Sequence, residues 1–189
     1  MTKKNEGKRF EEDFQKSCED FLYVRFQDSN KFGFGNVTRF TLESPCDCFI
    51  YDYPNMFFFE LKSTEGTSLS FVPNHPWEQV KVKGEKKKSD MIKPHQVKSL
   101  IDFSKSEGVE AGLIINLRER QTKTTFRPSR TFFLEINKFV EIATSVKDKK
   151  SISADEIVKH GMEIEGNKKV TRFSYNVESL LNMIRERMV

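Results

Sequence analysis

Residues 44–64 read S-P-C-D-C-F-I-Y-D-Y-P-N-M-F-F-F-E-L-K-S-T, which is two apolar runs separated by a turn at residues 53–55. Successive side chains of a β-strand point to opposite faces of the sheet. The second run therefore predicts a strand with one wholly apolar face, formed by Phe57, Phe59 and Leu61. A strand of this kind belongs in the core of the protein, so we expect the sheet to be organised around it.

The opposite face of the same strand combines Phe58 with two charged side chains, Glu60 and Lys62. If the turn makes a hairpin, Asp47 from the first run comes onto this face. Two carboxylates and an ammonium at one spot suit a hard cation such as Mg2+, with the lysine beside a reacting phosphate. Most Glu-x-Lys pairs on strands are solvated surface pairs of little consequence. The apolar flanks favour the metal site here, because buried charges persist only when paired or metal-bound.

Composition limits the class of protein. A chain of 189 residues with 37% hydrophobic and 32% charged residues is predicted to be globular, with one proper core. It contains no run of 18 apolar residues, and its N-terminus lacks a hydrophobic signal core, so we expect a cytoplasmic protein that does not enter the membrane. The odd number of cysteines, three, argues against a disulfide framework, and Cys46-x-Cys48 has the wrong spacing for a zinc knuckle. All three are predicted to be small buried residues.

The net charge of +4 is mildly basic, but the basic residues are unevenly distributed. Residues 81–98 contain seven lysines and only two acidic residues. Such a cluster is what binding to a phosphate backbone needs, and a solvated loop is an equally good explanation. Residues 68–77 hold two prolines and the only tryptophan, and the lysine-rich part that follows has no hydrophobic periodicity. We therefore predict a surface loop.

Apolar residues at helical spacing predict an amphipathic helix over residues 5–23. Glu11 lies beside the apolar stripe of this helix and is placed to lean toward the candidate site. Lys8 and Arg9 lie in its first part, where the helix dipole slightly disfavours cations. They are either part of an anion-binding surface or an ordinary charged terminus.

The remaining elements follow from periodicity, prolines and caps. A loop is expected at residues 27–36, and strands at 37–42, 46–53, 56–63, 112–117, 131–135 and 172–175. Helices are expected from Pro94, which suits the first position of a helix, at 137–146, at 153–159 behind a capping box, and at 177–187. The loop before 131–135 is basic, with Arg118, Arg120, Lys123, Arg127 and Arg130.

The predicted fold class is α/β, a mixed β-sheet flanked by helices in a single domain over residues 1–189. It includes a basic loop at about 78–93 and a C-terminal helical segment at about 151–189.

Several motifs in this order resemble a known family. Asp47, twelve intervening residues and then Glu60-Leu61-Lys62, after a helix that carries Glu11, resemble the restriction-endonuclease-like core of the PD-(D/E)xK nucleases. Within that superfamily the chain is similar to the RecU-type Holliday junction resolvases of Gram-positive bacteria and their phages. The other motifs that carry the resemblance are Asn5-x-Gly7-x-x-Phe10-Glu11, F-E-L-K-S-T at 59–64, His95-Gln96, and residues 112–116 and 151–175.

The resemblance implies a set of site residues. The catalytic residues would be Glu11, Asp47, Glu60, Lys62 and Gln96. Asp47 and Glu60 would hold Mg2+, with Mn2+ as an alternative ion, and the carbonyl of Leu61 would add a third oxygen. Lys62 would orient or activate the attacking water and offset charge on the phosphate. Gln96 would position water or metal, and Glu11 would complete the acidic cluster.

The resemblance also implies a DNA partner and a homodimer. The candidate DNA-binding residues are Lys8, Arg9, Lys81, Lys83, Lys86, Lys87, Lys88 and Lys93. Only residues 27–43 stand where the family has a protruding stalk, and extra length lies between Lys62 and His95. The lysine-rich loop is therefore a candidate substitute for the stalk.

The function that these features favour is a Mg2+-dependent DNA endonuclease that resolves four-way or branched DNA in recombination or phage DNA processing. Two alternatives remain open at this point. One is a PD-(D/E)xK nuclease for another substrate, such as a flap or a restriction-type duplex. The other is a DNA-binding module that keeps the fold and does not cut.

Overall fold

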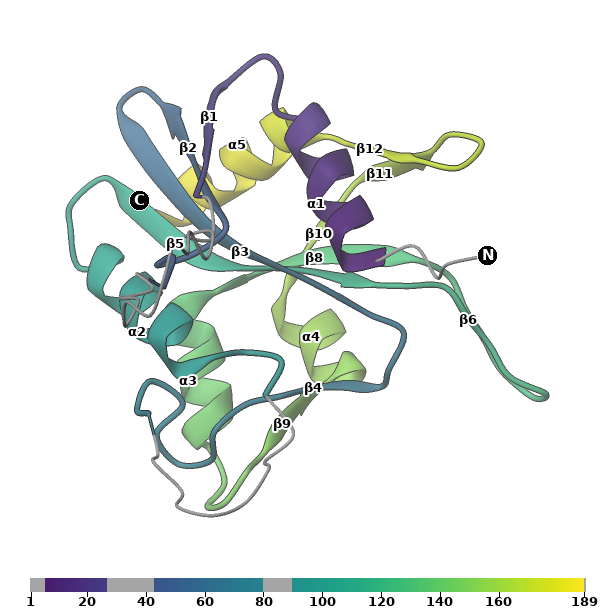
Figure 1. The fold of residues 1–189 in the computed structure, drawn as a ribbon. Helices are drawn as coiled ribbons and strands as arrows, with labels where there is room; N and C mark the ends of the chain where they lie inside the picture. Colours follow the sequence, from purple (N-terminus) through teal and green to yellow (C-terminus); the bar gives the residue numbers. More distant parts are fainter. Residues whose placement is uncertain (1–5, 27–42, 80–89, 189) are drawn as a thin grey trace, which may run out of the picture.

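A six-stranded sheet with the order β1-β2-β3-β5-β8-β10 forms the centre of the molecule (Figure 1). The structure is a computed structural model that describes residues 6–26, 43–79 and 90–188. The strands are β1 (Leu22–Arg25), β2 (Cys48–Asp52), β3 (Asn55–Thr64), β5 (Val109–Leu117), β8 (Arg130–Glu135) and β10 (Met162–Ile164). Only β3 and β5 pair in parallel, and the other neighbours are antiparallel. The predicted α/β class with a mixed sheet is confirmed.

Strand β3 is the long central strand, and both of its neighbours fix its register. It forms the predicted hairpin with β2, in which Cys48 lies opposite Phe59 and the turn is closed by Asp52 opposite Asn55. On its other side it pairs with β5 over its whole length. A strand in the middle of a sheet that helices cover on both faces buries the side chains of both its faces, which suits the run of phenylalanines in β3.

Helices cover both faces of the sheet (Figure 1). One face carries α1 (Glu6–Lys16) and α5 (Val177–Met188), and the other carries α2 (Pro94–Phe103), α3 (Ile136–Thr144) and α4 (Ala154–His160). The predicted alternation of β3 is confirmed: Phe57 and Phe59 pack in the core beneath α1 and α5, and Phe58 packs in the core beneath α2. The capping box of α4 is confirmed too, because the Ser153 hydroxyl accepts a hydrogen bond from the Glu156 backbone N–H.

The first helix is shorter than predicted, and the prediction of helix to residue 23 is wrong. Helix α1 ends at Lys16, where the Ser17 hydroxyl donates to the Asp13 carbonyl and competes with the helical backbone pattern. Residues 22–25 instead form the edge strand β1 on β2. Near residue 23 the apolar residues fit helical spacing only weakly, and pairing with the sheet stabilises a strand there instead.

Three short antiparallel pairs lie outside the main sheet. They are β4 (Ser68–Ser70) with β9 (Ser151–Ser153), β6 (Arg120–Gln121) with β7 (Phe126–Arg127), and β11 (Gly166–Lys168) with β12 (Phe173–Tyr175). The prediction of a surface loop from residue 68 is wrong in its first part. Leu69 and Phe71 are fully buried, because β4 pairs with β9 and carries them into the core beneath α3.

Several predictions fall on residues outside the described part of the chain. These are the loop at 27–36, the strand at 37–42 and the lysines at positions 81, 83, 86, 87 and 88. Among the described residues, each helix is too short or too polar to cross a lipid bilayer.

The close approach of β5 and β8 at Gly112 gives a test of the sheet. A Cβ atom at this position would lie 2.5 Å from the Leu134 carbonyl oxygen and 2.5 Å from the Phe133 ring. We expect Gly112→Ala to lower the free energy of unfolding by about 2 kcal/mol or more, because backbone must move to relieve the overlap. Urea denaturation followed by circular dichroism measures this. Gly66→Ala, whose Cβ would have its nearest contact with the Thr64 hydroxyl at 3.1 Å, serves as the comparison and should cost less. Equal losses would contradict the close approach.

Candidate active site

The β2–β3 hairpin brings Asp47 beside Glu60. The Asp47 backbone N–H donates to the Phe59 carbonyl at 3.2 Å, which continues the ladder one residue before β2 begins. The Asp47 carboxylate then accepts a hydrogen bond from the Leu61 backbone N–H, with 2.7 Å between Oδ2 and N. Because this contact fixes the carboxylate to the middle of β3, the Asp47 carboxylate lies close enough to Glu60 for the two charges to interact. The predicted convergence of Asp47, Glu60 and Lys62 on one face is observed.

Glu60 is buried, with 1% of its surface exposed, and two side chains contact one of its oxygens. Lys62 Nζ lies 2.5 Å from Glu60 Oε1, and Gln96 Nε2 donates to the same oxygen at 2.6 Å. Lys62 Nζ also donates to Gln96 Oε1 at 3.3 Å, so the three side chains form a closed set of contacts. Sequence reasoning expected Gln96 near this group, and the structure places it there.

The position of Gln96 follows from the start of α2. Pro94 occupies the first turn of this helix, as predicted, and Gln96 is the third helical residue. Its side-chain oxygen accepts the backbone N–H of Lys93 at 3.2 Å, which satisfies a donor that the helix start would otherwise leave free. The amide group is thereby held with its NH2 toward Glu60. One side chain both caps the helix and contacts the candidate site.

The second oxygen of Glu60 is the feature that a cation would explain. Oε2 is buried and has no hydrogen-bond partner among the described residues. A buried carboxylate oxygen without a partner is costly. Asp47 and Glu60 together offer carboxylate oxygens, which are the donors that Mg2+ and Mn2+ prefer. The donor set therefore fits a hard divalent cation, and the contribution of the Leu61 carbonyl stays a prediction.

Burial sets the protonation of Glu60. It raises the pKa of the Glu60 carboxyl from 4.5 to about 8, and the Lys62 ammonium offsets part of the effect. The nearby negative charge of Asp47 raises this pKa further. Two close carboxyl groups share a proton readily, and a bound cation displaces it. Without a cation, the folded protein therefore holds a proton on Glu60 at neutral pH.

Glu11 forms an ion pair with the edge strand β1. Its Oε2 lies 2.5 Å from Arg25 Nη2, an ion pair between α1 and the edge strand β1. Over the described ranges, no three Asp, Glu, His or Cys side chains form a group that could hold a metal ion. The place of Glu11 in the acidic cluster therefore stays a prediction. The catalytic role of Glu11 stays a prediction.

The basic residues predicted to bind DNA are only partly within the described chain. Lys8 lies on an exposed turn of α1, and Arg9 contacts Glu6 at 3.6 Å and donates to the Thr171 carbonyl. Lys93 is exposed directly before α2, three residues from Gln96. His95, the neighbour of Gln96, lies with Nδ1 3.1 Å from Glu43 Oε2, so its carboxylate partner is Glu43 rather than Glu60.

The three cysteines have no part in this chemistry. All are buried free thiols, as predicted, and burial raises the pKa of each thiol above its usual range. Cys46 lies next to Asp47 in the chain, and the charges of Glu60 and Asp47 also raise its thiol pKa. Neutral thiols are poor nucleophiles and poor metal ligands.

Comparison with known proteins shows similarity to a curated protein and to solved structures. Over 193 aligned residues the chain is 26% identical to the SPbeta prophage-derived uncharacterized protein YotM of Bacillus subtilis (strain 168), covering 95% of this chain and 87% of that protein. The structure is similar to Hjc of Archaeoglobus fulgidus, a Holliday junction resolvase, with a TM-score of 0.44 and 16% identity over 83% of this chain and 95% of that one. No protein-family model matches the chain.

Sequence reasoning missed two features around the site. It did not find β1, whose Arg25 pairs with Glu11, because residues 22 and 23 also fit the end of a helix. It also did not find that Gln96 contacts Glu60 and Lys62 together, since residues 60 and 96 are joined only through the β3–β5 pairing and the packing of α2. The helix-start signal at Pro94 was the one local clue to the place of Gln96.

The raised pKa of Glu60 predicts how stability changes with pH in the presence of a chelator. Between pH 4.5 and about 8 the unfolded chain has lost the proton that the folded chain keeps. The free energy of unfolding should therefore fall with rising pH by up to about 1.4 kcal/mol per unit and level off above that range. In Glu60→Gln this contribution is absent. Urea denaturation of both proteins in EDTA from pH 5 to 9 measures the difference, and parallel curves would contradict a neutral buried Glu60.

The ammonium of Lys62 lowers the pKa of Glu60, so its removal should raise that pKa further. In Lys62→Met we expect the stability curve in EDTA to keep falling to a higher pH than in the unchanged protein. The same denaturation series measures this shift. Lys98→Met, which removes an exposed lysine of α2, is the matched control and should leave the curve in place. A shift of equal size in the control would show a general charge effect instead.

Proposed function

We propose that the protein is a Mg2+-dependent DNA endonuclease that hydrolyses phosphodiester bonds in four-way or branched DNA. The observation that carries the proposal is the buried Glu60 carboxyl, whose Oε2 has no partner in the described residues while Asp47 lies beside it. A surface ion pair would be solvated and would not need the contacts from Lys62 and Gln96. The resemblance of residues 59–64 and 95–96 to the resolvase motifs supports the same chemistry.

The residues of the site divide the work between binding and proton transfer. The metal, when bound, supplies Lewis-acid charge stabilisation and a more acidic water. Asp47 and Glu60 hold it, and Glu60 releases its proton as it does so. Lys62 keeps a positive charge where negative charge grows on the phosphate, and Gln96 holds the Glu60 carboxylate in place through Oε1. Backbone contact from Leu61 fixes Asp47.

The finer parts of the proposal concern substrate and assembly. A homodimer would place two such sites for symmetric cuts in two strands, as closed two-fold symmetry allows. The Bacillus relative is a prophage-derived protein. Its origin fits the proposal that this protein acts in recombination or phage DNA processing in the cytoplasm of the host. The lysines at positions 81–88 are proposed to bind the DNA backbone.

The test is cleavage of a synthetic four-way junction and of a linear duplex with the same sequence, each with Mg2+ and with EDTA. We expect paired symmetric nicks on the junction that require Mg2+. Asp47→Ala should lower the rate by at least about 100-fold, because it removes a metal ligand. Asp155→Ala removes an exposed carboxylate at the start of α4 and should cut at the normal rate.

Each other outcome corresponds to one of the alternatives. Metal-dependent cutting of junction and duplex alike would retain the nuclease and reject the junction preference. Tight DNA binding without cutting in any metal would reject the enzyme and favour a DNA-binding module. Cutting that survives in Asp47→Ala would reject the assignment of the site.

A further inference from the structure

Two segments far apart in the chain hold an excess of basic residues that the candidate active site does not use. Residues 118–130 and 166–175 contain eight of the 32 basic residues and one of the 28 acidic residues. The rest of the chain is left with 24 basic and 27 acidic residues, so it is slightly acidic. These two segments, like residues 81–98, therefore carry a local excess of positive charge.

Both segments are short hairpins that project from the same end of the molecule (Figure 1). The first contains β6 and β7, and the second contains β11 and β12. An ion pair joins them, with 3.5 Å between Lys168 Nζ and Glu119 Oε2. The N-terminal end of α1 lies between them, and the second hairpin packs on this helix through Arg172, which contacts Asp13 at 2.6 Å. We call the surface formed by these segments the two-hairpin surface.

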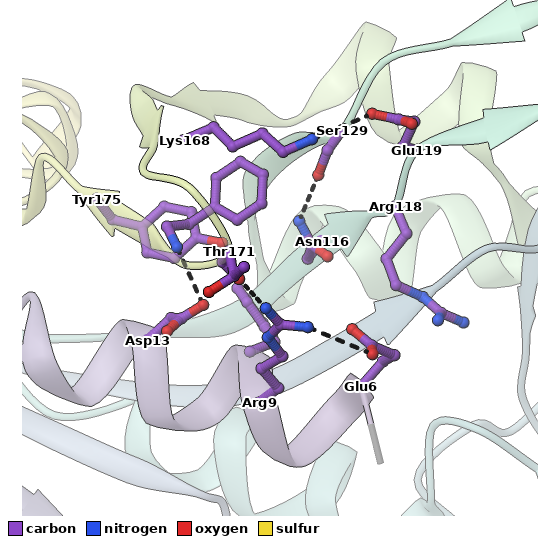
Figure 2. A pocket seen from close by; sticks show the side chains of 12 residues that line it. Glu6, Arg9, Asp13, Asn116, Arg118, Glu119, Ser129, Lys168, Thr171 and Tyr175 are labelled. Atoms are coloured by element: carbon purple, nitrogen blue, oxygen red, sulfur yellow. Dashed lines mark hydrogen bonds and ion pairs between the residues drawn. The ribbon is translucent and has the colours of Figure 1, made fainter. Parts of the chain in front are cut away.

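A cavity of about 350 Å³ lies at the base of the two-hairpin surface. Arg9, Arg118 and Lys168 reach its lining from three different elements (Figure 2). Asn116 and Ser129 add uncharged donors, with 3.3 Å between Asn116 Nδ2 and Ser129 Oγ. The Arg118 Nε atom is buried and has no hydrogen-bond partner within the described chain. Glu6 and Glu119 also line the cavity and pair with Arg9 and Lys168, so the partnerless Nε of Arg118 is the donor that a phosphate group would gain there.

The outer cations of the two hairpins are available to a ligand. Arg130 and Arg172 already pair with acidic residues. Arg120, Lys123 and Lys169 have no acidic partner in the described ranges. Phe126 is 57% exposed beside them and Val170 is 98% exposed at the turn of the second hairpin. Lys123 and Lys169 are exposed and Arg120 is half-buried. Exposed cations next to exposed apolar side chains are typical of nucleic-acid-binding surfaces.

The first hairpin is fixed relative to the candidate active site. The Arg127 guanidinium donates to the carbonyls of Gly66 and Glu65 at 3.0 Å each, and to that of Arg118 at 3.2 Å. The Arg118 N–H in turn donates to the Thr64 carbonyl at 2.8 Å, at the end of β3. Lys62 precedes Thr64 by two residues of strand, or about 7 Å. A ligand that covers the base of the hairpin therefore lies at the end of β3, on the α1 side of the sheet, whereas Glu60 and Lys62 project from the α2 side.

We propose that the two-hairpin surface binds the sugar–phosphate backbone of a DNA arm that extends past the end of β3, the strand that carries the candidate site. The proposal rests on the proposed function for its choice of DNA, and it adds a binding surface distinct from the lysine-rich segment. A regular row of phosphates matches cations that are spread over two hairpins and a cavity better than a single small anion does. An acidic protein partner is a separate class and is an outcome of the test.

The test compares DNA binding by the full chain and by Arg120→Gln/Lys123→Gln/Lys169→Gln. Fluorescence anisotropy with a labelled four-way junction and a labelled duplex, in EDTA to prevent cutting, gives the affinity at several salt concentrations. We expect the triple variant to bind at least about tenfold more weakly. Its plot of log affinity against log salt should be shallower by about 0.9 for each phosphate that the variant no longer neutralises. Lys147→Gln/Lys150→Gln/Lys159→Gln removes three exposed lysines around α3, β9 and α4 and should bind as the unchanged protein does.

The outcomes separate this proposal from the nuclease proposal. If the triple variant binds DNA with unchanged affinity and salt dependence while the unchanged protein still cuts, the two-hairpin surface is not a DNA-binding surface. If the unchanged protein does not cut but the triple variant loses binding, the surface stands and the nuclease fails. If both triple variants lose the same amount of DNA affinity, the loss follows from net charge alone, and the proposal is overturned. Preference for an RNA duplex over DNA, or binding only to an acidic protein, would overturn the choice of partner.

Discussion

The pleat of β3 is the constraint on which the fold and the candidate site both depend. Phe57 and Phe59 bury one face against α1 and α5, and Phe58 packs on the other face beneath α2. Glu60 is therefore buried, because helices cover both faces of its strand. Its burial is tolerated because Lys62 and Gln96 contact one oxygen and because the carboxyl can keep a proton. Packing energy from the aromatic face thus holds a strained electrostatic arrangement on the opposite face.

Much of the central architecture can be predicted from local patterns in the sequence. The alternation in β3, the turn before it, the start of α2 at Pro94 and the capping box at Ser153 each depend on residues within one or two turns of chain. The pairing of Asp47 with the face of Glu60 also follows, because a short turn leaves the hairpin only one register. These features are local, so their physical causes are visible in the sequence.

Other features depend on contacts between distant segments and were not predictable in the same way. Helix α1 ends early because β1 gains a partner in β2, and nothing near residue 17 shows that this partner exists. The segment after β3 is buried because β4 meets β9, more than eighty residues later. The partnerless Oε2 of Glu60 is likewise a property of the assembled site. The basic loop at 118–130 was recognised as a composition, but its neighbour at 166–175 and their shared position were not.

Arg127 gives the first hairpin an unusual division between base and tip. Three carbonyl groups from two different segments accept hydrogen bonds from its guanidinium. These bonds hold the base of the hairpin in place without any contribution from residues 122–125. Those four residues contact chiefly one another, through the hydroxyl and backbone groups of Thr122 and Thr125. The tip is therefore insulated from the core. It is a place where insertions, deletions or exchanged sequences can accumulate during evolution while the sheet and the candidate catalytic strand keep their geometry.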